Sequence, residues 1–171
     1  MVRLRGATTA DVPLLEYWDT QPHVVAATGD DGAQDWNREL ATQGPATETL
    51  IAELDNRAIG LIQIIDPAEE PTHYWGDVPS GLRAIDIWIG ESSDLGLGYG
   101  TEMMSEAIDR CFEGPEVTAI LIDPLTSNVR SHRFYQRLGF IPVGEQTFGT
   151  DRCLVHRLDR ATWSGRTQLH G

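Results

Sequence analysis

Three glycines at alternate positions form the part of this chain best suited to binding an anion. Gly96, Gly98 and Gly100 lie in the run Leu95–Thr101, after a predicted strand and at the predicted start of a helix. Glycines let main-chain N–H groups converge on a ligand, and a helix N-terminus adds partial positive charge. The run therefore predicts a pyrophosphate site that needs no basic side chain. The dinucleotide pattern G-x-G-x-x-G does not fit, because its third glycine would fall at Thr101.

A second set of polar side chains lies downstream, on a helix predicted from Asn128 to Leu138. Asn128 and Tyr135 are two turns apart, and Ser131 lies between them on the same face. Asn128 can cap the helix and also donate to a ligand, whereas the small Ser131 lets a narrow chain pass close to the backbone. Tyr135 presents a hydroxyl where that chain ends. The combination with the glycine run is more specific than either pattern alone.

A sheet with flanking helices is needed to position these residues. Alternating or continuous apolar residues predict strands near residues 2–5, 48–54, 58–66, 82–89, 117–122, 140–147 and 152–158. Helical spacing and capping signals predict helices near residues 9–18, 35–42, 98–112 and 128–138. We therefore expect an α/β fold, with a mixed central β-sheet flanked by about four helices.

The connecting segments carry predictions of their own. Residues 55–57 are typical of a tight hairpin turn, residues 67–81 are irregular, and a break rich in glycine and aspartate spans Gly29–Gly32. No periodicity follows Thr162, which predicts a frayed tail. The chain is thus expected to form one domain over residues 1–160, followed by a tail at 161–171.

The composition excludes several classes of function. The chain has 13 arginines, no lysine and 26 acids, for a net charge of −13. The absence of lysine excludes a phosphate-loop lysine and any Schiff-base mechanism. Residues 1–95 carry seventeen acids and five arginines, a balance of −12, whereas residues 96–171 carry nine acids and eight arginines, a balance of −1. Such a field attracts cations and repels nucleic acid and anionic lipid, so we expect neither as a partner.

No metal site or membrane segment is expected either. No stretch approaches the roughly 18 apolar residues of a membrane span, and the N-terminus lacks the apolar region of a secretory signal. We therefore expect a cytoplasmic location. Cys111 and Cys153 have no metal-ligand spacing, and the five histidines are scattered. Both cysteines are expected to be reduced and to pack as small hydrophobic residues.

The order strand, x-x-G-x-G loop, strand, and then Asn-x-x-small-x-x-x-Tyr-x-x-x-Gly-Phe resembles the acetyl-CoA signature of the GCN5-related N-acetyltransferase (GNAT) family. The resemblance implies a GNAT-type domain that uses acetyl-CoA as cosubstrate. It implies a cofactor site made by Asn128, Ser131, Ile87, Trp88, Ile89, Gly96, Leu97, Gly98, Tyr99, Gly100 and Thr101. It also implies that Tyr135 is the general acid that protonates the departing CoA thiolate. The family commonly has Arg or Gln where Leu95 stands, so that side-chain contact is missing here.

Within the family, the sequence most resembles aminoglycoside 6′-N-acetyltransferases. The resemblance is carried by the runs at residues 18–24, 83–91, 95–101 and 122–128. It implies that Asp86 and Asp123 hold ammonium groups of the drug and that His23 is also a substrate-binding residue. The tryptophans that typically follow the early His-Val are replaced by alanines and a threonine at 26–28. An aromatic surface for the sugar ring would then be either absent or supplied by Tyr74 and Trp75.

Amine acetylation needs a neutral nitrogen, so an ammonium substrate must lose a proton in or near the site. Asp86 lies three residues before Ile89, on the strand expected to line the cofactor. With a reference pKa of about 3.9, it is a better anchor for ammonium groups than a base, unless burial raises its pKa. Together with Asp123 and the acids of residues 69–77, it predicts a compact polycationic amine as substrate, first of all an aminoglycoside.

Three alternatives share parts of this pattern. A siderophore-pathway or other metabolic N-acyltransferase would use a longer acyl chain. A peptide N-terminal acetyltransferase would need an open groove in place of an acidic pocket. A non-catalytic acyl-CoA-binding sensor would not need Tyr135. Both a monomer and a homodimer are compatible with the sequence.

Overall fold

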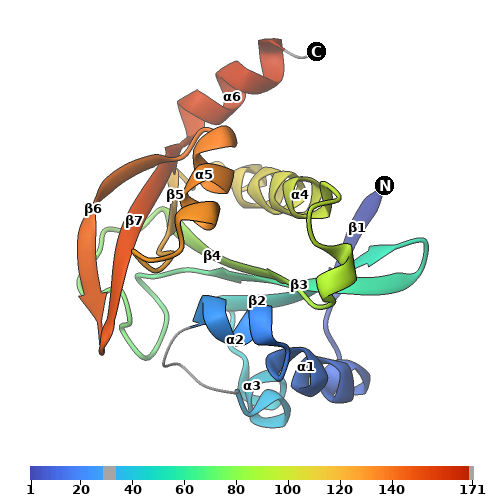
Figure 1. The fold of residues 1–171 in the computed structure, drawn as a ribbon. Coiled ribbons are helices and arrows are strands. Elements are labelled where there is room, and N and C mark those ends of the chain that lie inside the picture. The colour runs from blue at the N-terminus through green and yellow to red at the C-terminus, as the bar shows by residue number, and fades with distance from the viewer. Residues whose placement is uncertain (29–33, 170–171) are drawn as a thin grey trace.

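The computed structural model describes residues 1–28 and 34–169 as a mixed seven-stranded sheet with helices on both faces (Figure 1). The strands are β1 (Val2–Gly6), β2 (Thr47–Leu54), β3 (Arg57–Ile65), β4 (Leu82–Ile89), β5 (Ala119–Ile122), β6 (Ile141–Phe148) and β7 (Asp151–Asp159). Their order in the sheet is β1-β2-β3-β4-β5-β7-β6. The β4–β5 pair is parallel and the other neighbouring pairs are antiparallel. The expected single α/β domain with a mixed sheet is confirmed.

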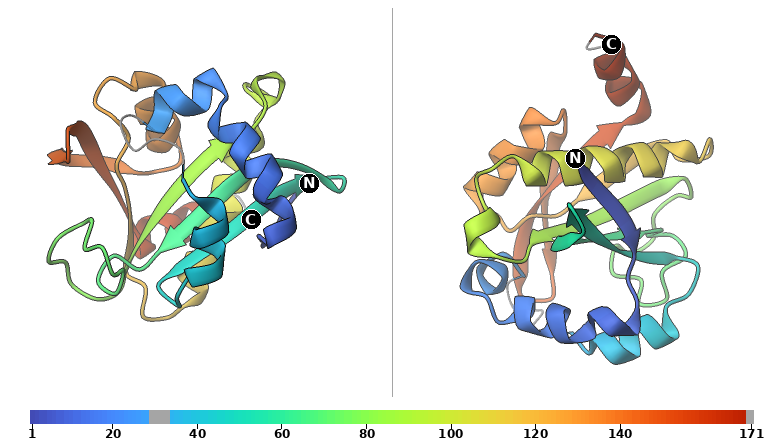
Figure 2. Two further views of the ribbon diagram at one scale, coloured as in Figure 1. Left: turned by 90° about the horizontal axis from the view of Figure 1, so that it is seen from below. Right: turned by 90° about the vertical axis from the view of Figure 1, so that its right-hand side faces the viewer.

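The described residues form six α-helices instead of the expected four or so. They are α1 (Val12–Asp19), α2 (Pro22–Thr28), α3 (Trp36–Thr42), α4 (Tyr99–Glu113), α5 (Val129–Arg137) and α6 (Arg160–Leu169), with single 3-10 turns at η1 (Thr9–Asp11) and η3 (Ser92–Asp94). Helices α4 and α5 cover one face of the sheet, and α1 to α3 cover the other (Figures 1 and 2). No helix in the described ranges has both the length and the apolarity to cross a membrane.

The alternation of side chains along β4 divides its apolar contacts between the two faces of the sheet. Ile85, Ile87 and Ile89 pack with the buried methionines of α4 on one face. Trp88 points to the other face and packs with the cluster formed by α1 and α3. The sheet around β4 is therefore covered on both sides, and one strand can serve sites on both faces.

The two unexpected helices are stabilised by contacts between residues far apart in sequence. In α2, Nε2 of His23 lies 2.7 Å from the carbonyl oxygen of Ile89 at the end of β4. In α6, the guanidinium of Arg160 donates to three main-chain carbonyls near the end of α4, and the indole of Trp163 donates to Asp109 at 2.7 Å. The expectation of an irregular tail from Thr162 is therefore wrong for residues 162–169. The break expected at Gly29–Gly32 lies outside the described residues.

The parallel pair at the centre of the sheet is short. Leu82–Ala84 of β4 pairs with Ala119–Leu121 of β5, and this ladder ends there. β4 continues to Ile89 paired with β3, while β5 ends at Ile122 paired with β7. Main-chain groups of residues 85–89 on the β5 side of β4 are therefore not used in the described sheet, and Asp86 lies in this stretch.

Candidate active site

The glycine loop (residues 95–101) joins the turn η3 to the long helix α4. Gly96 and Gly98 have φ values of +73° and +86°, a left-handed conformation that favours glycine. Gly98 is the N-cap of the 15-residue α4 and brings no capping side chain. The first N–H groups of α4 are therefore directed outward with the partial positive charge of the helix terminus. This geometry is compatible with an anionic phosphate group at the loop.

Helix α5 packs against this loop. A Cβ at Gly100 would lie 3.5 Å from the ring of Phe134 and 3.7 Å from Cδ1 of Ile89. A Cβ at Gly96 would lie 4.0 Å from Nη2 of Arg130. A cationic side chain thus lies beside the loop, which the sequence analysis missed because the two residues are far apart in the chain. Leu97, at the tip of the loop, is exposed.

An ion pair holds the segment that leads into the loop. The buried carboxylate of Asp94, in η3, accepts two hydrogen bonds from Arg57 of β3, at 2.8 and 2.9 Å. These hydrogen bonds hold the pKa of Asp94 below its usual value. Sequence reasoning placed Arg57 in the turn between β2 and β3. The turn residues are instead Asp55 and Asn56, with φ values of 51° and 65°, and Arg57 begins β3.

Tyr135 is 9% exposed and lies on the side of α5 that faces the core. Its ring meets Phe140 edge-on, with centroids 5.8 Å apart. Burial raises the pKa of Tyr135 well above its usual value, and the negative charges of Asp86 and Asp123 raise it further. Both carboxylates thus lie within electrostatic reach of the phenol. Its hydroxyl consequently stays protonated throughout the physiological range.

The other two α5 residues singled out from the sequence lie at the start of the helix. The side-chain oxygen of Asn128 accepts from the N–H of Ser131 at 3.2 Å, so its expected capping role is confirmed. The amide NH₂ is the part of Asn128 that could donate to a ligand. Ser131 is half-buried.

Asp123 follows β5 and is joined to an aromatic cluster. The hydroxyl of Tyr74 donates to Oδ2 of Asp123 at 2.5 Å. The Tyr74 ring stacks on Phe148, with centroids 4.4 Å apart and planes 7° from parallel, and Trp75 meets Phe148 edge-on. Tyr74 is 41% exposed and Trp75 only 8%, so Tyr74 offers the accessible aromatic surface.

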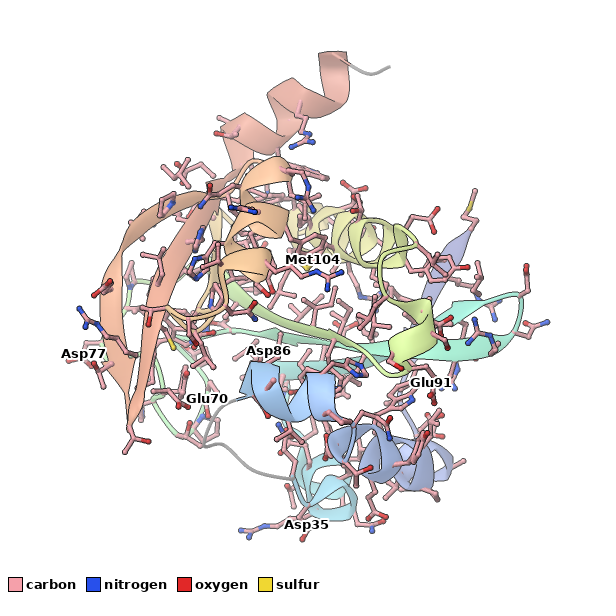
Figure 3. The ribbon with its side chains drawn as sticks, viewed as in Figure 1. Asp35, Glu70, Asp77, Asp86, Glu91 and Met104 are labelled. Carbon is pink, nitrogen blue, oxygen red and sulfur yellow. The ribbon has the colours of Figure 1, made fainter. Side chains whose placement is uncertain are left out.

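Asp86 lies on the face of β4 that points toward α2, as Figure 3 shows. Trp88 shares this face, and its ring lies 6.3 Å from that of Trp36. The side chain of Trp88 therefore points away from the glycine loop, unlike Ile87 and Ile89, which lie on the face of α4. At position 88, only the main chain of β4 can face a ligand on the loop side.

His23 and Glu70 each make hydrogen bonds with main-chain groups. Because a carbonyl can only accept, Nε2 of His23 carries the proton shared with Ile89, which orients α2 against β4. Glu70 accepts from the N–H groups of Thr72 and Tyr74, at 2.6 and 3.2 Å, and so shapes the segment that presents Tyr74. In Figure 3, Glu70 and Asp77 lie apart from Asp86.

No cluster of three or more potential ligands for a metal ion occurs in the described part of the chain. Both cysteines are buried, and neither forms a disulfide bond within the described residues. Burial raises the pKa of Cys111 to about 12, so its thiol is an unreactive core group.

The fold and the loop–helix pair define an acetyltransferase. Residues 7–148 match the family model described as "Acetyltransferase (GNAT) domain", so the chain belongs to the GNAT family. It is an acetyl-CoA-dependent N-acetyltransferase, and the glycine loop with α5 provides groups that fit this cosubstrate.

The chain is similar to several aminoglycoside-modifying acetyltransferases and to their crystal structures. The aminoglycoside N(6′)-acetyltransferase type 1 of Klebsiella pneumoniae is 31% identical over 154 residues, covering 85% of this chain and 77% of the relative. A kanamycin resistance protein of Rhizobium radiobacter is 40% identical over 79 residues, which cover 46% of this chain and 73% of that protein. The crystal structure of aminoglycoside acetyltransferase AAC(6′)-Ib with coenzyme A and kanamycin has a TM-score of 0.87 at 28% identity, covering 98% of this chain and 99% of that one.

Proposed function

We propose that this enzyme acetylates a compact polycationic amine, and that an aminoglycoside is acetylated at its 6′-amine. The observation that carries the proposal is the placement of two carboxylates, Asp86 in β4 and Asp123 directly after β5, whose charges add to the effect of burial in raising the pKa of Tyr135. They lie where the β4–β5 ladder has ended. The similarity to aminoglycoside N(6′)-acetyltransferases over most of the chain supports the same substrate class. A cytoplasmic location is part of the proposal.

The groups that would hold acetyl-CoA lie on the α4 face of the sheet. When bound, this cosubstrate supplies an acetyl group activated as a thioester. N–H groups of residues 96–101 and the N-terminus of α4 would hold the pyrophosphate. The amide of Asn128, the small side chain of Ser131 and the main chain of Ile87–Ile89 would lie beside the pantetheine.

Carboxylates would hold the amine. Partly buried, charge-assisted hydrogen bonds contribute about 1.5–3 kcal/mol each, so Asp86 and Asp123 together can fix a multiply charged molecule in one orientation. The hydroxyl of Tyr74 orients Asp123, and its ring, held by stacking on Phe148, provides a flat surface for a sugar. Tyr74 thereby serves as the aromatic surface in place of the missing tryptophans.

Two protons must move during the reaction. The attacking ammonium has to lose one proton, which Asp86 can accept directly or through one water. The departing sulfur has to gain one. Because the pKa of Tyr135 is held above its usual value, complete transfer to a thiolate is uphill. Its hydroxyl therefore acts first as a hydrogen-bond donor that stabilises the charge developing on sulfur.

The proposal is tested by measuring thiol release from acetyl-CoA with aminoglycosides, polyamines, amino acids and peptides as acceptors. We expect the highest kcat/KM with an aminoglycoside. A neutral or anionic best acceptor would refute the proposal. A clear preference for a longer acyl-CoA would favour a metabolic N-acyltransferase, a preference for peptides would favour a peptide N-terminal acetyltransferase, and tight CoA binding without transfer to any amine would favour a sensor.

A further inference from the structure

Three exposed arginines, Arg130, Arg133 and Arg137, recur at helical spacing along one side of α5. We call them the arginine stripe. The helix contains no acidic residue. Among the described residues, no carboxylate pairs with any of the three. Seven other arginines do form ion pairs: Arg3, Arg5, Arg57, Arg83, Arg110, Arg152 and Arg157. The stripe is thus a basic surface without counter-charge in a chain of net charge −13.

The stripe begins at the glycine loop. The side chain of Arg130 reaches the loop at Gly96. A Cβ added to Gly96 would lie 4.0 Å from Nη2 of Arg130. One turn further along α5, the ring of Phe134 packs at Gly100 and fixes the helix against the loop. The right-hand view of Figure 2 shows α5 beside the N-terminal end of α4. Arg133 and Arg137 follow Arg130 along α5.

Main-chain N–H groups and guanidinium groups suit different parts of an anionic ligand. The N–H groups of the loop converge on one phosphate group, which fits the bridging pyrophosphate of CoA. CoA also carries a separate phosphate on the 3′-oxygen of its ribose, a monoester with a charge of about −1.5 to −2 at neutral pH. A guanidinium binds such a phosphate bidentately and stays charged at every relevant pH.

We propose that the arginine stripe, led by Arg130, binds the 3′-phosphate of CoA and makes the enzyme discriminate CoA from 3′-dephospho-CoA. The contact lies on the α4 face of the sheet, opposite the face on which Asp86 lies. The inference rests on the acetyl-CoA dependence of the proposed function. It does not depend on which amine is acetylated.

Calorimetric titration of the enzyme with CoA and with 3′-dephospho-CoA tests the proposal without any turnover. We expect the wild type to bind CoA at least about tenfold more tightly, the effect of one charge-assisted contact. Arg130→Gln should weaken CoA binding by about tenfold and leave the Kd of 3′-dephospho-CoA unchanged. The matched control is Arg38→Gln, which removes an exposed arginine of α3 that forms no ion pair with the described residues and should change neither Kd.

Two results would overturn the proposal. One is equal affinity of the wild type for the two ligands, which needs no variant. The other is an Arg130→Gln enzyme whose affinity falls by the same factor for CoA and for 3′-dephospho-CoA. Arg130 would then act at the pyrophosphate, which both ligands carry. If no aminoglycoside were acetylated while CoA was still preferred over 3′-dephospho-CoA, the substrate proposal would fail and the arginine stripe would stand.

Discussion

The indole of Trp18 packs directly against the backbone of Gly90. A Cβ at Gly90 would lie 2.0 Å from Cε2 and 2.1 Å from Nε1 of that ring. Trp18 is fully buried in α1, and Gly90 follows β4 immediately, with its N–H donating to Ile59 at 3.0 Å. The contact joins the helices of one face to the point where the chain leaves β4 for the glycine loop.

This contact makes position 90 intolerant of any side chain. Gly90→Ala forces the Trp18 ring or the end of β4 to move, and overpacking of this kind costs roughly 1–3 kcal/mol. We expect a lower urea midpoint of unfolding. Gly44→Ala is the control, because Gly44 has open space and ordinary backbone angles, and it should change the midpoint little. An unchanged midpoint for Gly90→Ala would contradict the direct packing of Trp18 on Gly90.

The Arg57–Asp94 pair should matter more for the cosubstrate than for stability. Arg57→Gln removes both hydrogen bonds that hold η3 beside the glycine loop. We expect KM for acetyl-CoA to rise several-fold while KM for the amine stays within a factor of about two. The control is Arg5→Gln, which breaks a similar bidentate pair with Asp11 away from the loop. If both variants raised KM for acetyl-CoA equally, the Arg57–Asp94 pair would have no specific role in binding the cosubstrate.

A comparison of Gly98→Ala with Gly149→Ala distinguishes the effect of backbone strain on stability from the effect of an added side chain on CoA binding. Gly98 and Gly149 both have positive φ, +86° and +60°, and a Cβ at either meets no atom within 4 Å. Gly98→Ala and Gly149→Ala should therefore lose similar stability, of order 1 kcal/mol, from backbone strain. Calorimetry should show weaker CoA binding for Gly98→Ala alone. Retention of full CoA affinity by that variant would mean that the loop does not hold the pyrophosphate.

Tyr135→Phe should lower kcat and leave the Kd of CoA nearly unchanged. The expected loss is about 10²-fold, at the lower end for an acid catalyst, since water can partly replace the hydroxyl. Because the pKa of Tyr135 is raised, the protonated hydroxyl persists above the ordinary tyrosine pKa of about 10 and is lost only as pH rises through the higher folded value. Near pH 10, the pH profile of kcat should therefore have the same shape for the wild type and for Tyr135→Phe. Tyr17→Phe, an exposed site, is the control. A Tyr135→Phe enzyme with full kcat would remove this residue from the mechanism.

Much of this architecture follows from local sequence patterns. The strand 82–89 was predicted with the observed bounds, and α4 and α5 within a residue or so, because apolar periodicity and the caps Gly98 and Asn128 are local signals. Helix α2 was missed because its seven residues lack an apolar stripe and depend on the contact of His23 with Ile89.

The remaining site features depend on contacts that no local pattern records. Two examples are the contact of Arg130 with Gly96 and the ion pair of Arg57 with Asp94. In each, the two residues lie more than thirty positions apart in the sequence. Pattern reasoning also grouped Ile87, Trp88 and Ile89 together, although strand alternation turns the Trp88 side chain to the opposite face. Geometry was needed to divide these residues between the two faces.

The central claim, transfer of an acetyl group to a 6′-amine, is tested most directly with two aminoglycosides that differ only at C6′, one with an amine and one with a hydroxyl. Thiol release from acetyl-CoA is measured for each at saturating cosubstrate, and the product is located by NMR. We expect the amine to release one thiol per drug molecule with acetylation at N6′, and the hydroxyl analogue to release almost none. Equal release from both, or acetylation of a different amine, would contradict the account.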